Sequence, residues 1–214
     1  MSRARHGLWR AVCLETPRLR VLLPPVGFAG RYLAYFERNR EHLARWDPPR
    51  PEGFYTEAFW RERLLRDHDD FAADRALRLA LQWRDDPEGD VIGVCNFNQF
   101  VRGAFQAATV GYSLDQRVVG SGVMFEALGA ALAHMFDALG FHRIMANYMP
   151  HNERSGRLLR RLGFVVEGYA RDYLFIDGAW RDHILTALTN PSPAPPGNSG
   201  KPAARVARNP GRHT

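Results

Sequence analysis

Two glycines lie in a short run between two segments of different periodicity. Gly120 and Gly122 fall within residues 116–124, after an alternating stretch (107–115) and before a long amphipathic segment. The pattern predicts a strand, a glycine turn and the start of a helix. Because a helix N-terminus exposes unpaired N–H groups and about half a positive charge, this junction is a candidate phosphate site. Glycines also occur at such corners for conformational reasons alone.

The common nucleotide motifs do not fit this turn. Neither Lys nor Thr follows Gly122, so the turn is not a Walker P-loop. A dinucleotide fingerprint would need a third glycine and an acidic strand end further on. Nucleotide hydrolysis and hydride transfer are therefore disfavoured.

The remaining reactive side chains give weaker signals. By residue type alone, Asn152 is a helix N-cap and Ser155 a first-turn residue of the same helix. The histidines lack ligand spacing, so no metal site is expected. Cys13 and Cys95 match no metal or redox spacing and sit at no predicted site, which argues against covalent catalysis and favours a reduced, intracellular protein.

Hydrophobic periodicity predicts the elements that must position these residues. An alternating first strand is followed by two helical segments, the second capped by Thr56, and then by three strands joined by short turns. The amphipathic helix ends at Gly140, and the strand, helix, strand order there requires a parallel crossover. Asp177-Gly178 predicts a final hairpin. The expected strands are 14–23, 77–83, 91–100, 107–114, 143–148, 165–176 and 180–188, and the expected helices are 28–46, about 56–69, 124–139 and a short helix after Asn152 that runs up to Gly163.

Composition indicates one folded domain with basic ends. The chain has 214 residues, 45% of them hydrophobic, and a formal charge of +6. Seven cations lie in the first ten residues and after residue 190, so the body is nearly neutral. We predict a flexible N-terminus (1–13), one domain (14–190) and a disordered tail rich in Pro, Ala and Arg (191–214). Specific nucleic-acid recognition is disfavoured, although loose contact of the tails with ribosomal RNA stays open. Without a long apolar run, no membrane contact is expected, and the protein is expected in the cytoplasm.

Longer motifs resemble a known superfamily. Arg117-x-x-Gly120-x-Gly122, Asn152-x-x-Ser155 and Leu162-Gly163-Phe164 resemble the GCN5-related N-acetyltransferase (GNAT) superfamily. Within it, the chain is most similar to the RimJ-type ribosomal-protein-alanine N-acetyltransferases. The segments that carry this likeness are 16–19, 39–43, 124–128, 142–152 and 176–183.

The resemblance implies an α/β fold with a mixed sheet of about seven strands, splayed between the fourth and fifth, and four main helices. It also implies acetyl-coenzyme A as co-substrate, with its diphosphate on the amides of residues 117–123 and its pantetheine arm in the splay. The residues implied for this cofactor are Gly111, Tyr112, Ser113, Leu114, Arg117, Val118, Val119, Gly120, Ser121, Gly122, Val123, Asn147, Asn152 and Ser155.

The resemblance also implies roles in catalysis. Ser155 would protonate the departing thiolate and Asn152 would anchor the cofactor, because Leu159 occupies the position where many relatives have a tyrosine acid. Thr109 stands where many relatives have a glutamate, so the general base stays open, with water relayed from Asn96 or Asn98 as one hypothesis. Thr109, Tyr169 and Tyr173, together with Asp172, are candidates for the acceptor side; packing of the tyrosines on the sheet is the alternative.

The expected reaction is acetyl transfer to the N-terminal α-amine of a protein, a ribosomal-protein alanine by resemblance. An α-amine with a pKa near ~8 is roughly a tenth neutral at pH 7, whereas a lysine near ~10.4 is neutral below about one part in a thousand. An enzyme without a strong base should therefore prefer N-termini. Two alternatives stay open: a ribosome-assembly factor on the same scaffold, and an acetyltransferase for small amines such as antibiotics. The oligomeric state does not follow from the sequence.

Overall fold

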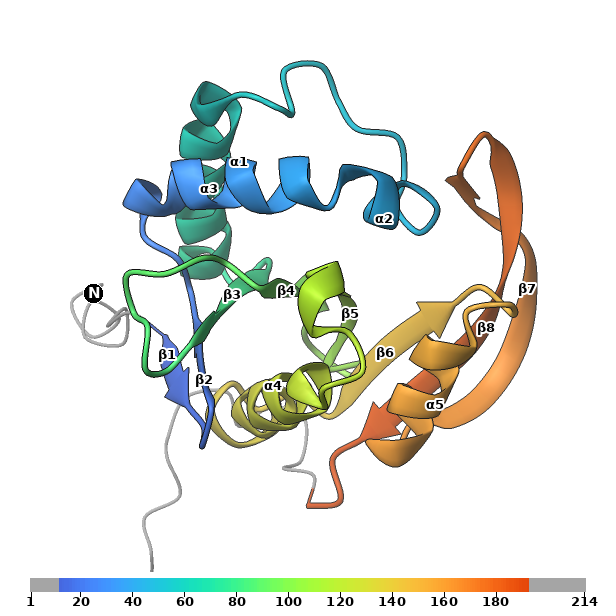
Figure 1. Cartoon of the computed structure of the whole chain (residues 1–214). Helices are drawn as coiled ribbons and strands as arrows, with labels where there is room; N and C mark the ends of the chain where they lie inside the picture. The colour runs from blue at the N-terminus through green and yellow to red at the C-terminus, as the bar shows by residue number, and fades with distance from the viewer. Residues whose placement is uncertain (1–11, 193–214) are drawn as a thin grey trace, which may run out of the picture.

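The computed structural model describes residues 12–192 and shows one mixed sheet with helices on both faces (Figure 1). The eight strands of the sheet run in the order β1-β2-β3-β4-β5-β6-β8-β7. Their bounds are β1 Cys13–Glu15, β2 Leu19–Leu22, β3 Leu77–Trp83, β4 Gly93–Val101, β5 Ala107–Leu114, β6 Arg143–Tyr148, β7 Val165–Ile176 and β8 Ala179–Thr189.

One strand pair differs from the others. β5 and β6 are parallel, joined by the crossover through α4, and every other neighbouring pair is antiparallel. Their register covers only three pairs, from Ala107 opposite Arg143 to Thr109 opposite Met145. Beyond these pairs the two strands separate. The predicted α/β fold with a splay between these two strands is therefore confirmed.

The helices form two layers because side chains alternate across the strands. On β3, Leu79 and Leu81 belong to the core that includes α4, whereas Ala80 packs with α1 and α3. Leu159 of α5 joins the α4 side. Figure 1 shows α1 and α3 crossing on one side of the sheet and α4 on the other. The helices are α1 Ala29–Arg38, α2 Arg40–Ala44, α3 Glu57–Ala72, α4 Val123–Ala133, continued by a π turn at His134–Ala138, and α5 Glu153–Arg161.

The structure has one strand and one helix more than expected, and side-chain hydrogen bonds account for each break. The first strand is two strands, because a turn closes at residues 16–19 where Thr16 Oγ1 accepts the Leu19 N–H at 2.9 Å. The first helix ends at Arg38 because the following residue, Asn39, is fully buried with its side chain bonded to its surroundings. Its Nδ2 donates to the Tyr35 carbonyl at 2.9 Å, and its Oδ1 accepts the Gln116 N–H at 3.0 Å.

Other predicted boundaries agree closely. Thr56 caps α3, accepting the Phe59 N–H at 3.2 Å. Gly140 follows the long helix with φ 69°, and the β7–β8 turn has positive φ at Asp177 and Gly178. The strands begin at Cys13 and end at Thr189. Most of the predicted flexible ends, 1–13 and 191–214, lies outside the described residues. Among the described helices, none is long and apolar enough to cross a membrane.

Candidate active site

A cavity of about 720 Å³ opens where β5 and β6 separate. The end of β5, the glycine turn, α5 and the strands β6 to β8 form its walls, and the segment after α1 closes one side. The lining residues are His42, Leu43, Trp46, Asp47, Pro48, Val110, Gly111, Tyr112, Ser113, Leu114, Val119, Gly120, Gly122, Val123, Met124, Phe125, Asn147, Tyr148, Met149, Asn152, Arg154, Ser155, Arg157, Leu158, Arg161, Leu174, Ile176 and His183.

The glycine turn presents an uncapped helix end to this cavity. Gly122 is the N-cap of α4 with φ 79°, and Gly120 has φ 86°, conformations that favour glycine. Among the described residues, no side chain caps α4. The first-turn carboxylate of Glu126 is turned to Arg18, whose Nε donates to it at 2.6 Å. The first N–H groups of α4 can therefore donate hydrogen bonds to an anion in the cavity.

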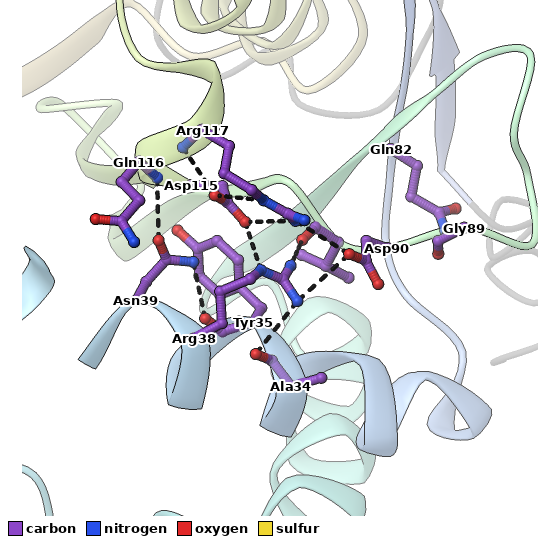
Figure 2. Close-up of polar contacts among 11 residues, drawn as sticks. Ala34, Tyr35, Arg38, Asn39, Gln82, Gly89, Asp90, Asp115, Gln116 and Arg117 are labelled. Atoms are coloured by element: carbon purple, nitrogen blue, oxygen red, sulfur yellow. Dashed lines mark hydrogen bonds and ion pairs between the residues drawn. The ribbon is translucent and has the colours of Figure 1, made fainter. Parts of the chain in front are cut away.

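A buried aspartate holds the segment between β5 and this turn (Figure 2). The Asp115 side chain is fully buried and receives Arg38 Nε at 2.6 Å and Arg117 Nη2 at 2.9 Å. Arg117 also reaches Asp90 at 3.0 Å. Burial alone would raise the pKa of Asp115, but the hydrogen bonds from Arg117 and Arg38 hold it well below its usual range. Asp115 therefore ties the loop to Arg38 of α1, and the Arg117 side chain is held against Asp115 and Asp90 instead of lining the cavity.

Two hydroxyl groups meet on the opposite wall. Tyr112 Oη and Ser155 Oγ are 2.6 Å apart and join β5 to the first turn of α5. Burial raises the pKa of Tyr112 well above its usual range, although the Ser155 hydrogen bond opposes this shift, so Tyr112 stays protonated at neutral pH. Asn152 Oδ1 accepts the Ser155 N–H at 3.2 Å, which makes Asn152 the N-cap. The geometry thus places Ser155 in a hydroxyl pair at a helix N-terminus.

The third wall contains residues from separate segments. Trp46 stacks on His151 with ring centroids 5.6 Å apart, and Asp47 is paired with Arg50. On the sheet side, His183 and Asn147 line the cavity. Burial raises the pKa of Asp47, against the opposing influence of Arg50. This wall is aromatic and polar, whereas the glycine turn offers mainly backbone.

The structure separates the sequence-predicted residues into two groups. Residues 111–114, Val119, Gly120, Gly122, Val123, Asn147, Asn152 and Ser155 line the cavity, and Arg117, Val118 and Ser121 do not. Thr109 Oγ1 instead donates to the Asn98 carbonyl at 3.3 Å. Tyr169 is exposed and donates to Asp182, while Tyr173 touches two lining residues, Asn147 and His183.

Several lining residues were missed by sequence reasoning. Trp46 and Asp47 sit where the pattern indicated only a helix end, and His183 was considered only as a metal ligand. Arg154, Arg157 and Arg161 lie at helical spacing on α5, a signal that could have indicated a cationic wall. Within residues 12–192, no group of three or more His, Cys, Asp or Glu side chains could hold a metal ion.

Comparison with known proteins assigns the chain to a family. The chain belongs to the GNAT acetyltransferases, because the acetyltransferase (GNAT) domain matches residues 20–165. It is 48% identical over 184 residues to the [ribosomal protein uS5]-alanine N-acetyltransferase of Escherichia coli (strain K12), covering 86% of this chain and 94% of that protein.

Solved structures agree with this assignment. The ribosomal-protein-S5-alanine acetyltransferase of Vibrio fischeri is 40% identical with a TM-score of 0.82, covering 86% of this chain and all of that one. Mycobacterium smegmatis RimJ in complex with CoA-disulfide is 27% identical with a TM-score of 0.76, covering 84% and 86%.

Proposed function

We propose that this protein transfers an acetyl group from acetyl-coenzyme A to the N-terminal α-amine of a ribosomal protein, with alanine as the first residue. The observation that carries the proposal is the cavity between β5 and β6, which joins an uncapped helix N-terminus to the Tyr112–Ser155 hydroxyl pair. The relatives named above, which act on ribosomal protein S5 or uS5, support the acceptor.

The residues present fit coenzyme A. Its diphosphate needs N–H donors, which the first turn of α4 supplies through Val123 and Met124, and cations, which Arg157 and Arg161 of α5 supply. The cavity volume of about 720 Å³ lies within the range of small-molecule sites, roughly 300–1,000 Å³. When bound, the coenzyme supplies an activated acetyl thioester. The chain's own residues orient it and exclude water.

Ser155 is the proposed proton donor for the departing thiolate. Its Oγ lies 2.6 Å from Tyr112 Oη, so a proton lost by the serine can be replaced through the tyrosine hydroxyl. The N-terminus of α5 also stabilises negative charge that develops nearby. Asn152 holds the Ser155 backbone at the start of that helix.

The acceptor side is proposed to bind a peptide end. Trp46, His42 and Asp47 after α1 face the same cavity as Asn147 and His183 of the sheet. A ribosomal acceptor implies action in the cytoplasm, and contact of the basic ends with ribosomal RNA stays a proposal.

A turnover assay tests this function. Purified protein with acetyl-coenzyme A should acetylate peptides that begin with Ala, and those that begin with Ser or Met less well, while a peptide with a blocked N-terminus and one internal lysine should stay unmodified. Mass spectrometry locates the acetyl group. Faster modification of the internal lysine, or no turnover with any N-terminus, would refute the proposal.

A further inference from the structure

One buried histidine in the cavity has no role in the function proposed so far. His183 lies on β8, is 3% exposed and lines the cavity. Its Nδ1 is 2.9 Å from the Arg181 carbonyl oxygen. Because a carbonyl can only accept, Nδ1 carries the hydrogen in the neutral ring and Nε2 holds the lone pair. Within residues 12–192, Nε2 makes no hydrogen bond.

The ring is held in place from two sides. Tyr173 of β7 packs against it, with ring centroids 5.2 Å apart. The Tyr173 hydroxyl accepts a hydrogen bond from Asn147 Nδ2 at 3.0 Å, and Asn147 Oδ1 accepts the Thr186 N–H at 3.3 Å. Asn147 is opposite Leu185, two residues from His183, so Asn147 and His183 share a face of the sheet. These contacts fix the tautomer and the orientation of the imidazole.

The other basic side chains of the cavity are less suited to accept a proton. Asp47 is the one carboxylate among the lining residues, and it is ion-paired with Arg50. His42 lies on the short helix α2, is half-buried and has no hydrogen bond to another described residue that would select its tautomer. Thr109 lies outside the cavity, and its hydroxyl cannot act as a base.

We propose that His183 is the general base, with Nε2 taking a proton from the acceptor's α-ammonium group. This inference rests on the proposed function. The freed amine attacks the thioester carbonyl, so a C–N bond forms and the C–S bond breaks. Of the two protons that the ammonium loses, one passes through Nε2 to solvent. The other is matched by the proton that the thiolate gains from Ser155.

The charged and titratable groups around the imidazole come from several elements. Asp182 precedes it on β8 and Tyr173 flanks it on β7. The other charged and titratable lining residues are Tyr148 of β6, which is opposite Ile184 of β8, Tyr112 of β5, His42 of α2, Asp47, and Arg154, Arg157 and Arg161 of α5.

The test compares two variants with the wild type. His183→Asn keeps a donor near the position of Nδ1 and His183→Gln keeps polarity near Nε2, but neither accepts a proton at neutral pH. The measurement is kcat/KM for an N-terminal-alanine peptide from about pH 5.5 to 9.5, a range that brackets the α-amine pKa near ~8. Coenzyme A affinity by calorimetry reports folding. His68→Gln, on α3 outside the cavity, is the matched control.

We expect both variants to lose about 100-fold or more in kcat/KM at pH 7, with coenzyme A affinity unchanged. The loss should shrink as the pH rises through ~8, because the free amine then needs no base. His68→Gln should match the wild type. A loss of less than about threefold, or an equal loss at every pH, would overturn the role of His183.

The wild type gives a second readout that no misfolded variant can obscure. Its kcat/KM should level off below the amine pKa near ~8, because the enzyme itself removes the proton. A profile that follows the amine through ~8 would contradict the proposal. A wild type that binds coenzyme A but acetylates no peptide overturns the proposed function as well, whereas an active wild type with unaffected variants overturns only the base.

Discussion

At the scale of single residues, two kinds of polar group surround the cavity: a pair of hydroxyl groups that lines it, and a buried ion-pair network that does not. The Tyr112–Ser155 hydrogen bond joins β5 to the first turn of α5. It allows the tyrosine hydroxyl to return a proton to the serine. Asp115, by contrast, is paired with two arginines and does not line the cavity. Proton transfer and loop placement are thus assigned to different side chains.

Ser155→Ala should lower kcat about 100-fold and leave coenzyme A affinity nearly unchanged, because it removes a proton donor and no binding contact to the diphosphate. Tyr112→Phe keeps Ser155 but removes its partner, so a smaller loss is expected. In the double variant the two losses should not add. Steady-state kinetics measures kcat, and calorimetry measures the affinity for coenzyme A. An unchanged kcat for Ser155→Ala would show that the serine has no part in the mechanism.

Asp115→Asn should lower the free energy of unfolding by about 3 kcal/mol, because it breaks a buried pair and leaves Arg38 with only its longer ion pair to Asp90 at 3.4 Å. The matched control is Glu62→Gln, which breaks an exposed pair with Arg66 and should cost less than about 0.5 kcal/mol. Urea unfolding followed by circular dichroism measures both. Equal effects of the two substitutions would show that the network is dispensable.

The same carboxylate predicts a pH dependence of stability. Its pKa is lower in the folded protein than in the unfolded chain, so its contribution is full above the unfolded value near ~3.9 and is lost as the pH falls below it. The wild type should therefore lose more stability than Asp115→Asn between about pH 5 and pH 3. Parallel pH profiles of the two proteins would contradict this origin.

At the scale of elements, the β5–α4 junction depends on backbone conformations that few residues adopt. Gly122→Ala should destabilise the protein by about 1–2 kcal/mol because φ is 79°, and it should weaken coenzyme A binding. Gly129→Ala, within the same helix and with open space around the added carbon, should stabilise it by about 0.5–1 kcal/mol. Thermal unfolding and calorimetry distinguish the two. If Gly122→Ala were as stable as the wild type and bound coenzyme A equally well, the positive φ at this turn would not be required.

The elements themselves follow from local patterns to a large extent. β5, β6 and β7 have the predicted bounds, because alternation, Gly140 and the Asp177-Gly178 turn act locally. The break at Asn39 could not be predicted, because it depends on a side chain that bonds to a residue made adjacent by folding. Asn39 reaches Gln116 on the glycine loop.

The candidate site was predicted on one side only. The strand and helix order made the glycine turn a candidate anion site, whereas the place of Ser155 at the site was implied by the resemblance to the GNAT superfamily; both line the cavity. His42 and Trp46 come from the segment after α1 and His183 from β8, and only folding brings these two distant segments together. The ion pair of the Arg117 side chain could not be predicted, because its partner, Asp115, is a neighbour whose burial the sequence does not reveal.

At the scale of the whole molecule, the separation of cationic ends from a nearly neutral body suggests a division of labour. A protein truncated to residues 12–192 should retain turnover on free peptides, because the cavity and its walls lie within that range. Its binding to ribosomal subunits, measured by co-sedimentation at low and moderate salt, should weaken. Loss of peptide turnover on truncation would instead place part of the site in the ends.

Only three residue pairs join β5 to β6, so the sheet consists of two halves that are connected over this short stretch. Within the described chain, the strand edges beyond that stretch face no partner strand, and a ligand with amide groups could complete the missing ladder. Loading the donor should then slow deuterium uptake at residues 146–148 while residues 77–83 exchange as before. Deuterium exchange in the sheet would thus show whether the acetyl donor is bound.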